Sequence, residues 1–116
     1  MIKMVATDID GTILRGDFGF SPAVKECVRG LCKRGIKVVL VTGRMHCAAL
    51  KLAQELGLDT PIVSYQGGMI KDNSLDGKVY YNKYLEPEYA KKIIDWAKQN
   101  NIHINLYMDD VLYVEK

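Results

Sequence analysis

Apolar runs and amphipathic stretches alternate along the first part of the chain. Apolar runs at residues 2–7, 36–41 and 61–65 are typical of strands buried in a sheet. Between them, apolar residues recur at helical spacing, at positions 24, 27, 28, 31 and 32 and again at 45, 48, 49, 52, 53 and 56. The alternation predicts an α/β fold, a partial Rossmann-like parallel sheet with helices on both faces.

Capping residues indicate where the predicted helices begin and end. Ser21 and Pro22 form a typical helix start, because serine caps free backbone N–H groups and proline suits the first helical position. Gly35 and Gly57 are typical helix ends. The two helices therefore fit between the three predicted strands.

The pattern changes near residues 82–87. Before this point, residues 69–70 are expected to pair with residues 79–81 across a run of turn residues. After it, Pro87 opens an amphipathic helix, and residues 102–108 and 111–115 predict a hairpin that turns at Asp109 and Asp110. We therefore predict two parts, residues 1–82 and residues 83–116.

Two carboxylates follow the first predicted strand. Asp8 and Asp10 are separated by one residue, so in an extended segment they lie on one side. Ile9 then points away from them, and Gly11 permits the chain to turn. This layout suits phosphoryl transfer, with Asp8 as the nucleophile that forms an aspartyl-phosphate and Asp10 as general acid and then base. Mg²⁺ is then required, because two carboxylates and a phosphate dianion repel one another.

The second predicted strand runs into Thr42, Gly43 and Arg44 before the next helix. A hydroxyl and free backbone N–H groups at such a junction can hold a phosphate. On its own, this triplet is typical of an ordinary turn. Because adjacent parallel strands present their ends at one edge of a sheet, we expect it to lie beside Asp8 and Asp10.

Composition narrows the class of protein. The net charge of the 116 residues is only +2 and the lysines are dispersed, which argues against a nucleic-acid-binding module. No apolar run approaches the ~20 residues of a transmembrane helix. Asp8 interrupts the first run before it could act as a signal peptide. We therefore expect a cytoplasmic protein that does not contact a membrane.

The cysteines and histidines carry no recognisable motif. Cys27, Cys32 and Cys47 have neither metal-binding nor redox spacing, and reduced thiols are expected. Cys27 and Cys32 fall on the apolar stripe of the first helix, which predicts that they are core residues. His46 follows the predicted phosphate turn, and we expect it on the surface at the start of the second helix.

The motifs resemble those of the haloacid dehalogenase superfamily of phosphohydrolases, in particular its Cof-type, sugar-phosphatase-like branch. Residues 8–14 are similar to the nucleophile motif, and residues 41–44 are similar to the phosphate-binding motif. Residues 62–70 resemble the family's third-strand segment, in which Gln66 stands where the family usually has asparagine. The resemblance covers the whole chain. It implies that residues 83–116 are the start of an α/β cap inserted over the active site.

The resemblance also implies roles for individual residues. Asp8 would be the nucleophile and a Mg²⁺ ligand, and Asp10 the acid and base that binds Mg²⁺ through its backbone carbonyl. Arg44 is a candidate substrate contact, and the substrate would be a small phosphorylated metabolite. The expected phosphate-binding residues are Gly11, Thr12, Thr42 and Gly43.

Members of this branch are much longer than 116 residues. After the cap they supply a lysine that neutralises the phosphoryl group and a Gly-Asp-x-x-x-Asp stretch that completes the Mg²⁺ site, and neither is identifiable here. We therefore expect a Mg²⁺-dependent phosphomonoester hydrolase that is truncated in this chain and poorly active alone. The alternative is a non-catalytic relative that binds phosphate or a partner. A phosphoacceptor receiver domain fits less well, because Thr42 stands where its acceptor aspartate would be.

The first strand is central in the family's sheet. In this chain residues 2–7 are expected to form an open, apolar edge in which Lys3 is the only charge. Open apolar edges recruit partner strands. We therefore expect that the isolated chain either self-associates through this strand or is a proteolytic or partly disordered remnant of a longer protein.

Overall fold

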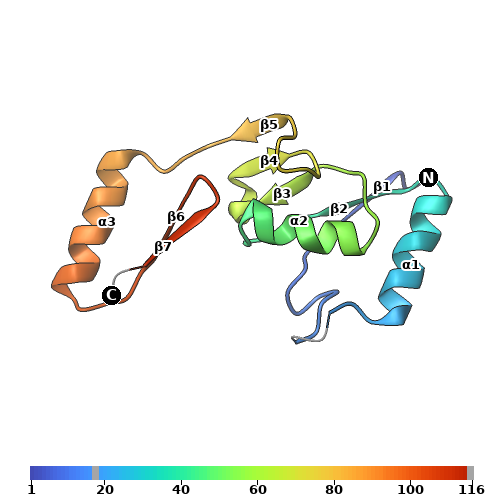
Figure 1. Ribbon diagram of the computed structural model, residues 1–116, viewed down its shortest axis with the longest axis horizontal. Helices are drawn as coiled ribbons and strands as arrows, with labels where there is room; N and C mark the ends of the chain where they lie inside the picture. The colour runs from blue at the N-terminus through green and yellow to red at the C-terminus, as the bar shows by residue number, and fades with distance from the viewer. Residues whose placement is uncertain (17–18, 115–116) are drawn as a thin grey trace. The chain divides into compact units, whose positions relative to one another are not determined.

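The chain folds into two compact units, Met1–Asn82 and Lys83–Lys116. The computed structural model describes residues 1–16 and 19–114. The elements of the first unit are β1 (Met4–Thr7), α1 (Pro22–Lys33), β2 (Lys37–Leu40), α2 (His46–Glu55), β3 (Ile62–Ser64), the short 3-10 helix η1 (Tyr65–Gly67), β4 (Met69–Lys71) and β5 (Val79–Asn82) (Figure 1). Those of the second unit are α3 (Pro87–Gln99), β6 (Asn105–Met108) and β7 (Val111–Val114).

The sheet of the first unit begins with two parallel strands. β1 and β2 pair in parallel, with Thr7 opposite Leu40. A parallel bridge joins Val41 to Val63, where the N–H of Thr42 donates a hydrogen bond to the carbonyl oxygen of Val63 at 2.9 Å. β3 therefore lies beside the end of β2, and the ends of both strands meet at one edge. The predicted α/β class is confirmed.

The sheet continues with antiparallel strands. β4 pairs with both β3 and β5, and Ile70 lies opposite Tyr81. This pairing confirms the one predicted between residues 69–70 and residues 79–81. The start of α1 also agrees with the sequence pattern, since the Ser21 side chain accepts a hydrogen bond from the N–H of Val24 at 3.3 Å.

The apolar core of the first unit lies where α1 packs against β2 and α2 packs against β3. Leu40 on β2 and Ile62 on β3 are fully buried there. Ile9, from the turn after β1, belongs to the same cluster. The buried apolar residues of this cluster are Ile9, Leu14, Phe20, Val28, Val38, Leu40, Ala49, Leu50, Ala53, Leu56, Leu58 and Ile62.

Cys27 and Cys32 are exposed, so the prediction that they are core residues is wrong. α1 buries only Val28, with Val24 and Leu31 partly buried beside it. At helical spacing these three apolar residues form the centre of one stripe, and the two cysteines lie on its opposite flanks. α1 packs against β2 through the centre of the stripe, and both flanks remain exposed.

His46 is fully buried at the first residue of α2, so its predicted surface position is also wrong. The buried residues of α2 are His46, Ala49, Leu50 and Ala53. They form one continuous stripe at helical spacing. His46 therefore belongs to the face that packs inward.

The second unit consists of a helix and a hairpin. Ala97 is its buried residue on α3. β6 and β7 pair antiparallel and turn at Asp109 and Asp110, which confirms the predicted hairpin, although its first strand begins at Asn105 and not at residue 102. Both aspartates have left-handed φ. Residue 115 of the predicted last strand lies outside the described residues. None of the helices that the structure describes is long and apolar enough to cross a membrane.

β1 has an open edge. Within residues 1–16 and 19–114, β1 pairs only with β2. The apolar side chains of Met4 on this strand and of Ile2 just before it are 58% and 70% exposed. Self-association through β1 therefore stays a prediction that rests on an exposed, apolar strand.

Replacing Met4 by lysine is expected to turn a self-associated chain into a monomer of 13.1 kDa, because a charge on an edge strand disfavours pairing with another strand. Size-exclusion chromatography with light scattering measures the mass. The matched control is Leu75→Lys, which adds the same charge at an exposed residue away from β1. A wild-type chain that is already monomeric would show that the edge recruits no partner.

Candidate active site

The turn after β1 carries both predicted catalytic carboxylates. β1 ends at Thr7, and the carbonyl oxygen of Ile9 then accepts hydrogen bonds from three following N–H groups, at 2.9, 3.1 and 3.3 Å. Gly11 has a φ of 74°, a left-handed conformation that glycine adopts at little cost. Asp8 and Asp10 thus lie where the strand ends and a turn begins, as the sequence indicated.

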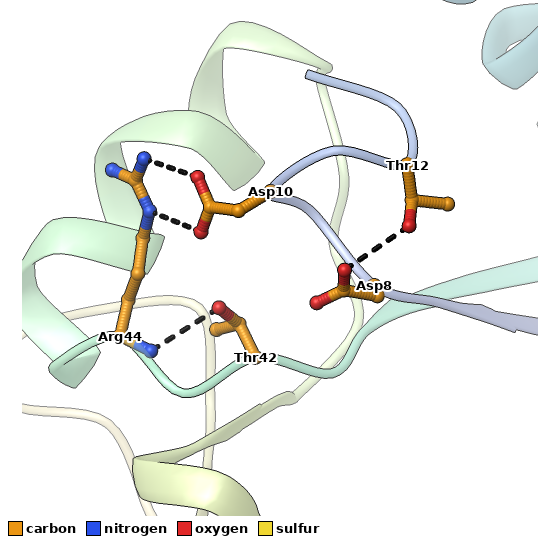
Figure 2. Close-up of polar contacts among 5 residues, drawn as sticks. All are labelled: Asp8, Asp10, Thr12, Thr42 and Arg44. Carbon is orange, nitrogen blue, oxygen red and sulfur yellow. Dashed lines mark hydrogen bonds and ion pairs between the residues drawn. The ribbon is translucent and has the colours of Figure 1, made fainter. Parts of the chain in front are cut away.

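Asp8 is exposed and stands at the start of this turn. The hydroxyl of Thr12 donates a hydrogen bond to Oδ2 of Asp8 at 3.1 Å (Figure 2). Among the described residues, no group donates a hydrogen bond to the other carboxylate oxygen, Oδ1. Asp8 therefore keeps an oxygen atom that can bind or attack a ligand.

Asp10 forms a bidentate ion pair with Arg44. Nε of Arg44 lies 2.8 Å from Oδ2 of Asp10, and Nη2 lies 2.6 Å from Oδ1 (Figure 2). The hydrogen bonds from Arg44 hold the pKa of Asp10 below its ordinary value. Asp10 is therefore a carboxylate at neutral pH.

Replacing Arg44 by alanine is expected to raise the pKa of Asp10 toward its ordinary 3.8. The pKa of Asp10 is lower in the folded chain than in the unfolded chain. The ion pair therefore stabilises the fold at pH values above the unfolded pKa, and this stabilisation is lost as the pH falls through the folded pKa. Both side chains are partly exposed, so the free energy of unfolding at neutral pH should fall by no more than about 1 kcal/mol.

A ¹³C NMR titration of the Asp10 carboxyl group measures this pKa. Arg29→Ala, which removes an exposed arginine from α1, is the matched control and should leave the pKa of Asp10 unchanged. An equal pKa in wild type and Arg44→Ala would show that the ion pair does not form in solution.

The turn after β2 presents a hydroxyl and a free N–H group. Thr42 is buried, and its Oγ1 accepts a hydrogen bond from the N–H of Arg44 at 3.2 Å, which leaves the hydroxyl proton to be donated. The N–H of Gly43 donates to no group among the described residues. Thr42 and Gly43 can therefore offer hydrogen bonds to an anion.

A cavity of about 430 Å³ joins the two turns. It is lined by Ala6, Thr7, Asp8, Val41, Thr42, Gly43, Gln66 and Gly67. The structure thus brings Asp8 together with Thr42 and Gly43. The other predicted site residues stand outside the lining: Gly11 shapes the turn, Thr12 bonds Asp8, and Asp10 and Arg44 bond each other.

Gln66 and Gly67 are cavity residues to which sequence reasoning gave no role. They belong to η1, which follows β3 at the same edge of the sheet as the two turns. The signal in the sequence was the Gln-Gly-Gly turn after the third predicted strand. Its position beside the phosphate turn depends on the pairing of Val41 with Val63.

Comparisons with known proteins agree with this geometry. A family model described as haloacid dehalogenase-like hydrolase matches residues 5–116. Phosphatase YwpJ of Bacillus subtilis is 28% identical over 112 residues, which cover 97% of this chain and 39% of that protein. The B. subtilis 5-amino-6-(5-phospho-D-ribitylamino)uracil phosphatase YwtE is 31% identical over 111 residues, covering 96% of this chain and 37% of that protein.

A solved structure gives the same result for the fold. A haloacid dehalogenase-like hydrolase from B. subtilis matches with a TM-score of 0.86 and 27% identity, over 99% of this chain and 40% of that one. The chain thus spans 37% to 40% of the length of these three relatives. Because the family model matches almost every residue and the fold agrees, the chain belongs to the haloacid dehalogenase-like hydrolase family.

Proposed function

We propose that this chain supplies the nucleophile and the phosphate-binding residues of a phosphomonoester hydrolase. The observation that supports the proposal most directly is the cavity in which the carboxylate of Asp8 lies with Thr42 and Gly43. One relative, YwtE, is named for a small phosphorylated substrate. By analogy, we propose a small phosphorylated metabolite as the substrate.

The proposed reaction has two steps. In the first, a carboxylate oxygen of Asp8 attacks phosphorus, the bond from phosphorus to the leaving oxygen breaks, and Asp10 gives that oxygen a proton. In the second, Asp10 takes a proton from water, which attacks the aspartyl-phosphate and releases phosphate from Asp8. The ion pair with Arg44 keeps Asp10 ionised, as the second step requires. Protonation of Asp10 for the first step requires this pair to open.

The proposal includes a Mg²⁺ ion. Mg²⁺ in proteins typically binds one or two carboxylates and takes its other ligands from water and substrate phosphate. The free carboxylate oxygen of Asp8 is a hard donor of this kind. Among the described residues no group of three or more His, Cys, Asp or Glu side chains could hold a metal ion, so the other ligands would be backbone, water or phosphate oxygens. Asp8 and the backbone carbonyl of Asp10 would hold the ion, which offsets the negative charge of the phosphoryl group.

We further propose that the second unit, Lys83–Lys116, begins a cap that covers the active site in the longer relatives. Its support is that the unit is compact and that the family match continues through it. Selection among phosphorylated substrates would then depend on the cap, and the chemistry on the first unit.

Replacing Asp10 by asparagine is expected to trap phosphate on the protein when acetyl phosphate is the donor. Acetate leaves without a proton from Asp10, so the first step proceeds, whereas the base for the second step is removed. After incubation with ³²P-labelled acetyl phosphate and Mg²⁺, acid-quenched Asp10→Asn protein should carry several times more label than wild type. Peptide mapping should place the label on Asp8. The matched control is Asp76→Asn, an exposed aspartate in the turn between β4 and β5.

The same measurement separates the proposal from its alternative, a relative that binds phosphate without catalysis. The observation behind that alternative is that the cavity lining holds no cationic side chain to stabilise the charge of a transferring phosphoryl group. Such a protein would bind inorganic phosphate but show no covalent label on Asp8 in any variant. Label on a different residue would contradict Asp8 as the nucleophile.

A further inference from the structure

The side chain of Gln66 lies directly over Gly43. A Cβ atom at position 43 would be 2.3 Å from Nε2 of Gln66 and 2.9 Å from its Cδ. Both separations are shorter than non-bonded atoms tolerate, so any side chain at position 43 would displace this amide. Gly43 therefore leaves the space in which the amide of Gln66 enters the cavity.

The backbone around Gln66 is anchored to the phosphate turn. The N–H of Tyr65 donates to the carbonyl oxygen of Arg44 at 3.0 Å, and the N–H of Gln66 donates to that of Thr42 at 3.1 Å. Tyr65 and Gln66 have φ values of 52° and 55°, in the left-handed region that residues with a side chain rarely adopt. Conformations of this kind persist where surrounding contacts hold them, and they are concentrated at functional sites.

The cavity offers few hydrogen-bond donors to an anion. Its one charged side chain, Asp8, is itself negative. The hydroxyl of Thr7 already donates to the carbonyl oxygen of Asp8 at 3.0 Å. The remaining side-chain donors of the lining are the hydroxyl of Thr42 and the amide of Gln66, and no group in the described part of the chain hydrogen-bonds to that amide.

We propose that the side-chain amide of Gln66 donates a hydrogen bond to a phosphoryl oxygen bound between Asp8 and the turn at Thr42 and Gly43. This inference rests on the proposed function, because it takes the cavity to be the phosphate site. Phosphate carries several acceptor oxygens, and Gln66 approaches from η1, whereas Thr42 and Gly43 approach from the end of β2. Gln66 thus adds a neutral donor on another side of the anion and offsets part of its repulsion by Asp8.

Two variants with side chains of nearly the same size test the side-chain amide of Gln66. Neither variant changes the left-handed φ that position 66 must adopt. Gln66→Met keeps the length of the side chain and removes its donors, and Gln66→Glu replaces the donor by a negative oxygen. Inorganic phosphate is titrated into ¹⁵N-labelled chain with Mg²⁺ present, and the side-chain NH₂ signals of Gln66 and the N–H signal of Gly43 are followed. Thermal unfolding checks that each variant is folded, and Gln54→Met, on the exposed side of α2, is the matched control.

The NH₂ signals of Gln66 should shift together with the Gly43 signal in wild type. Gln66→Met should weaken phosphate binding about 10- to 150-fold, as expected for a lost hydrogen bond to a charged group. Gln66→Glu should weaken it further, and Gln54→Met should not change it.

Two other outcomes would overturn the inference, and they differ in what they leave standing. If Gly43 responds to phosphate while Gln66→Met binds it as tightly as wild type, Gln66 is not a ligand and the phosphate site stands. If neither Gly43 nor Gln66 responds in wild type, both the inference and the proposed phosphate site are wrong.

Discussion

Replacing Asp8 by asparagine is expected to lower the rate of phosphomonoester hydrolysis by several orders of magnitude in a protein that joins this chain to the remainder of the family's fold. An amide oxygen is a far weaker nucleophile than a carboxylate, so the first step cannot proceed through it. The substitution keeps the size of the side chain, and asparagine can still accept the hydrogen bond from Thr12. Initial rates of p-nitrophenyl phosphate hydrolysis with Mg²⁺ measure the effect.

Phosphate binding separates a chemical effect of Asp8→Asn from a structural one. Without Mg²⁺, the variant should bind inorganic phosphate at least as well as wild type, because one of the negative charges that repel the anion is gone. Asp95→Asn, which removes an exposed carboxylate from α3, should change neither rate nor binding. A turnover in Asp8→Asn equal to that of wild type would refute Asp8 as the nucleophile.

The parts of the site that follow from backbone geometry could be predicted from the sequence. Parallel strands present their carboxyl ends at the same edge, so the order of motifs along the chain was enough to place Asp8 beside Thr42. The glycine at position 11 indicated a turn, and the chain there has the left-handed φ that glycine permits. Such features depend on local residue types and on a pairing rule that holds for most α/β proteins.

Features that depend on which surfaces meet could not be predicted. Cys27 and His46 both lie near an apolar stripe, and only the packing of the helices on β2 and β3 decides that the first is exposed and the second is buried. The ion pair of Arg44 with Asp10, from the neighbouring turn, was not predicted either, and the expected contact of Arg44 with substrate stays a prediction. The left-handed φ of Gln66 is likewise imposed by hydrogen bonds to a distant segment, because glutamine itself does not favour it.

Ile9 links the apolar core to the candidate active site. It is fully buried, whereas Asp8 and Asp10 on either side of it are exposed. Its side chain belongs to the apolar core, and its carbonyl oxygen accepts the three hydrogen bonds that close the turn. The position of Asp8 at the cavity therefore depends on a side chain that does not line the cavity.

Replacing Ile9 by alanine is expected to lower the free energy of unfolding by roughly 2–5 kcal/mol, because a fully buried side chain leaves a cavity when it is shortened. Ile9→Val removes one methylene group and should cost only about 0.5–1.5 kcal/mol. Urea denaturation measures both, and Leu75→Ala, at an exposed residue, should stay within about 0.5 kcal/mol of wild type.

Phosphate binding by Ile9→Ala also tests what holds the turn that carries Asp8 and Asp10. If the side chain of Ile9 anchors the turn, folded Ile9→Ala protein should bind inorganic phosphate more weakly than Ile9→Val, although neither variant changes a cavity residue. A variant as stable as Leu75→Ala would mean that Ile9 is not packed in the core. Loss of stability with unchanged phosphate binding would mean that the carbonyl of Ile9 and the left-handed Gly11 are enough to place Asp8.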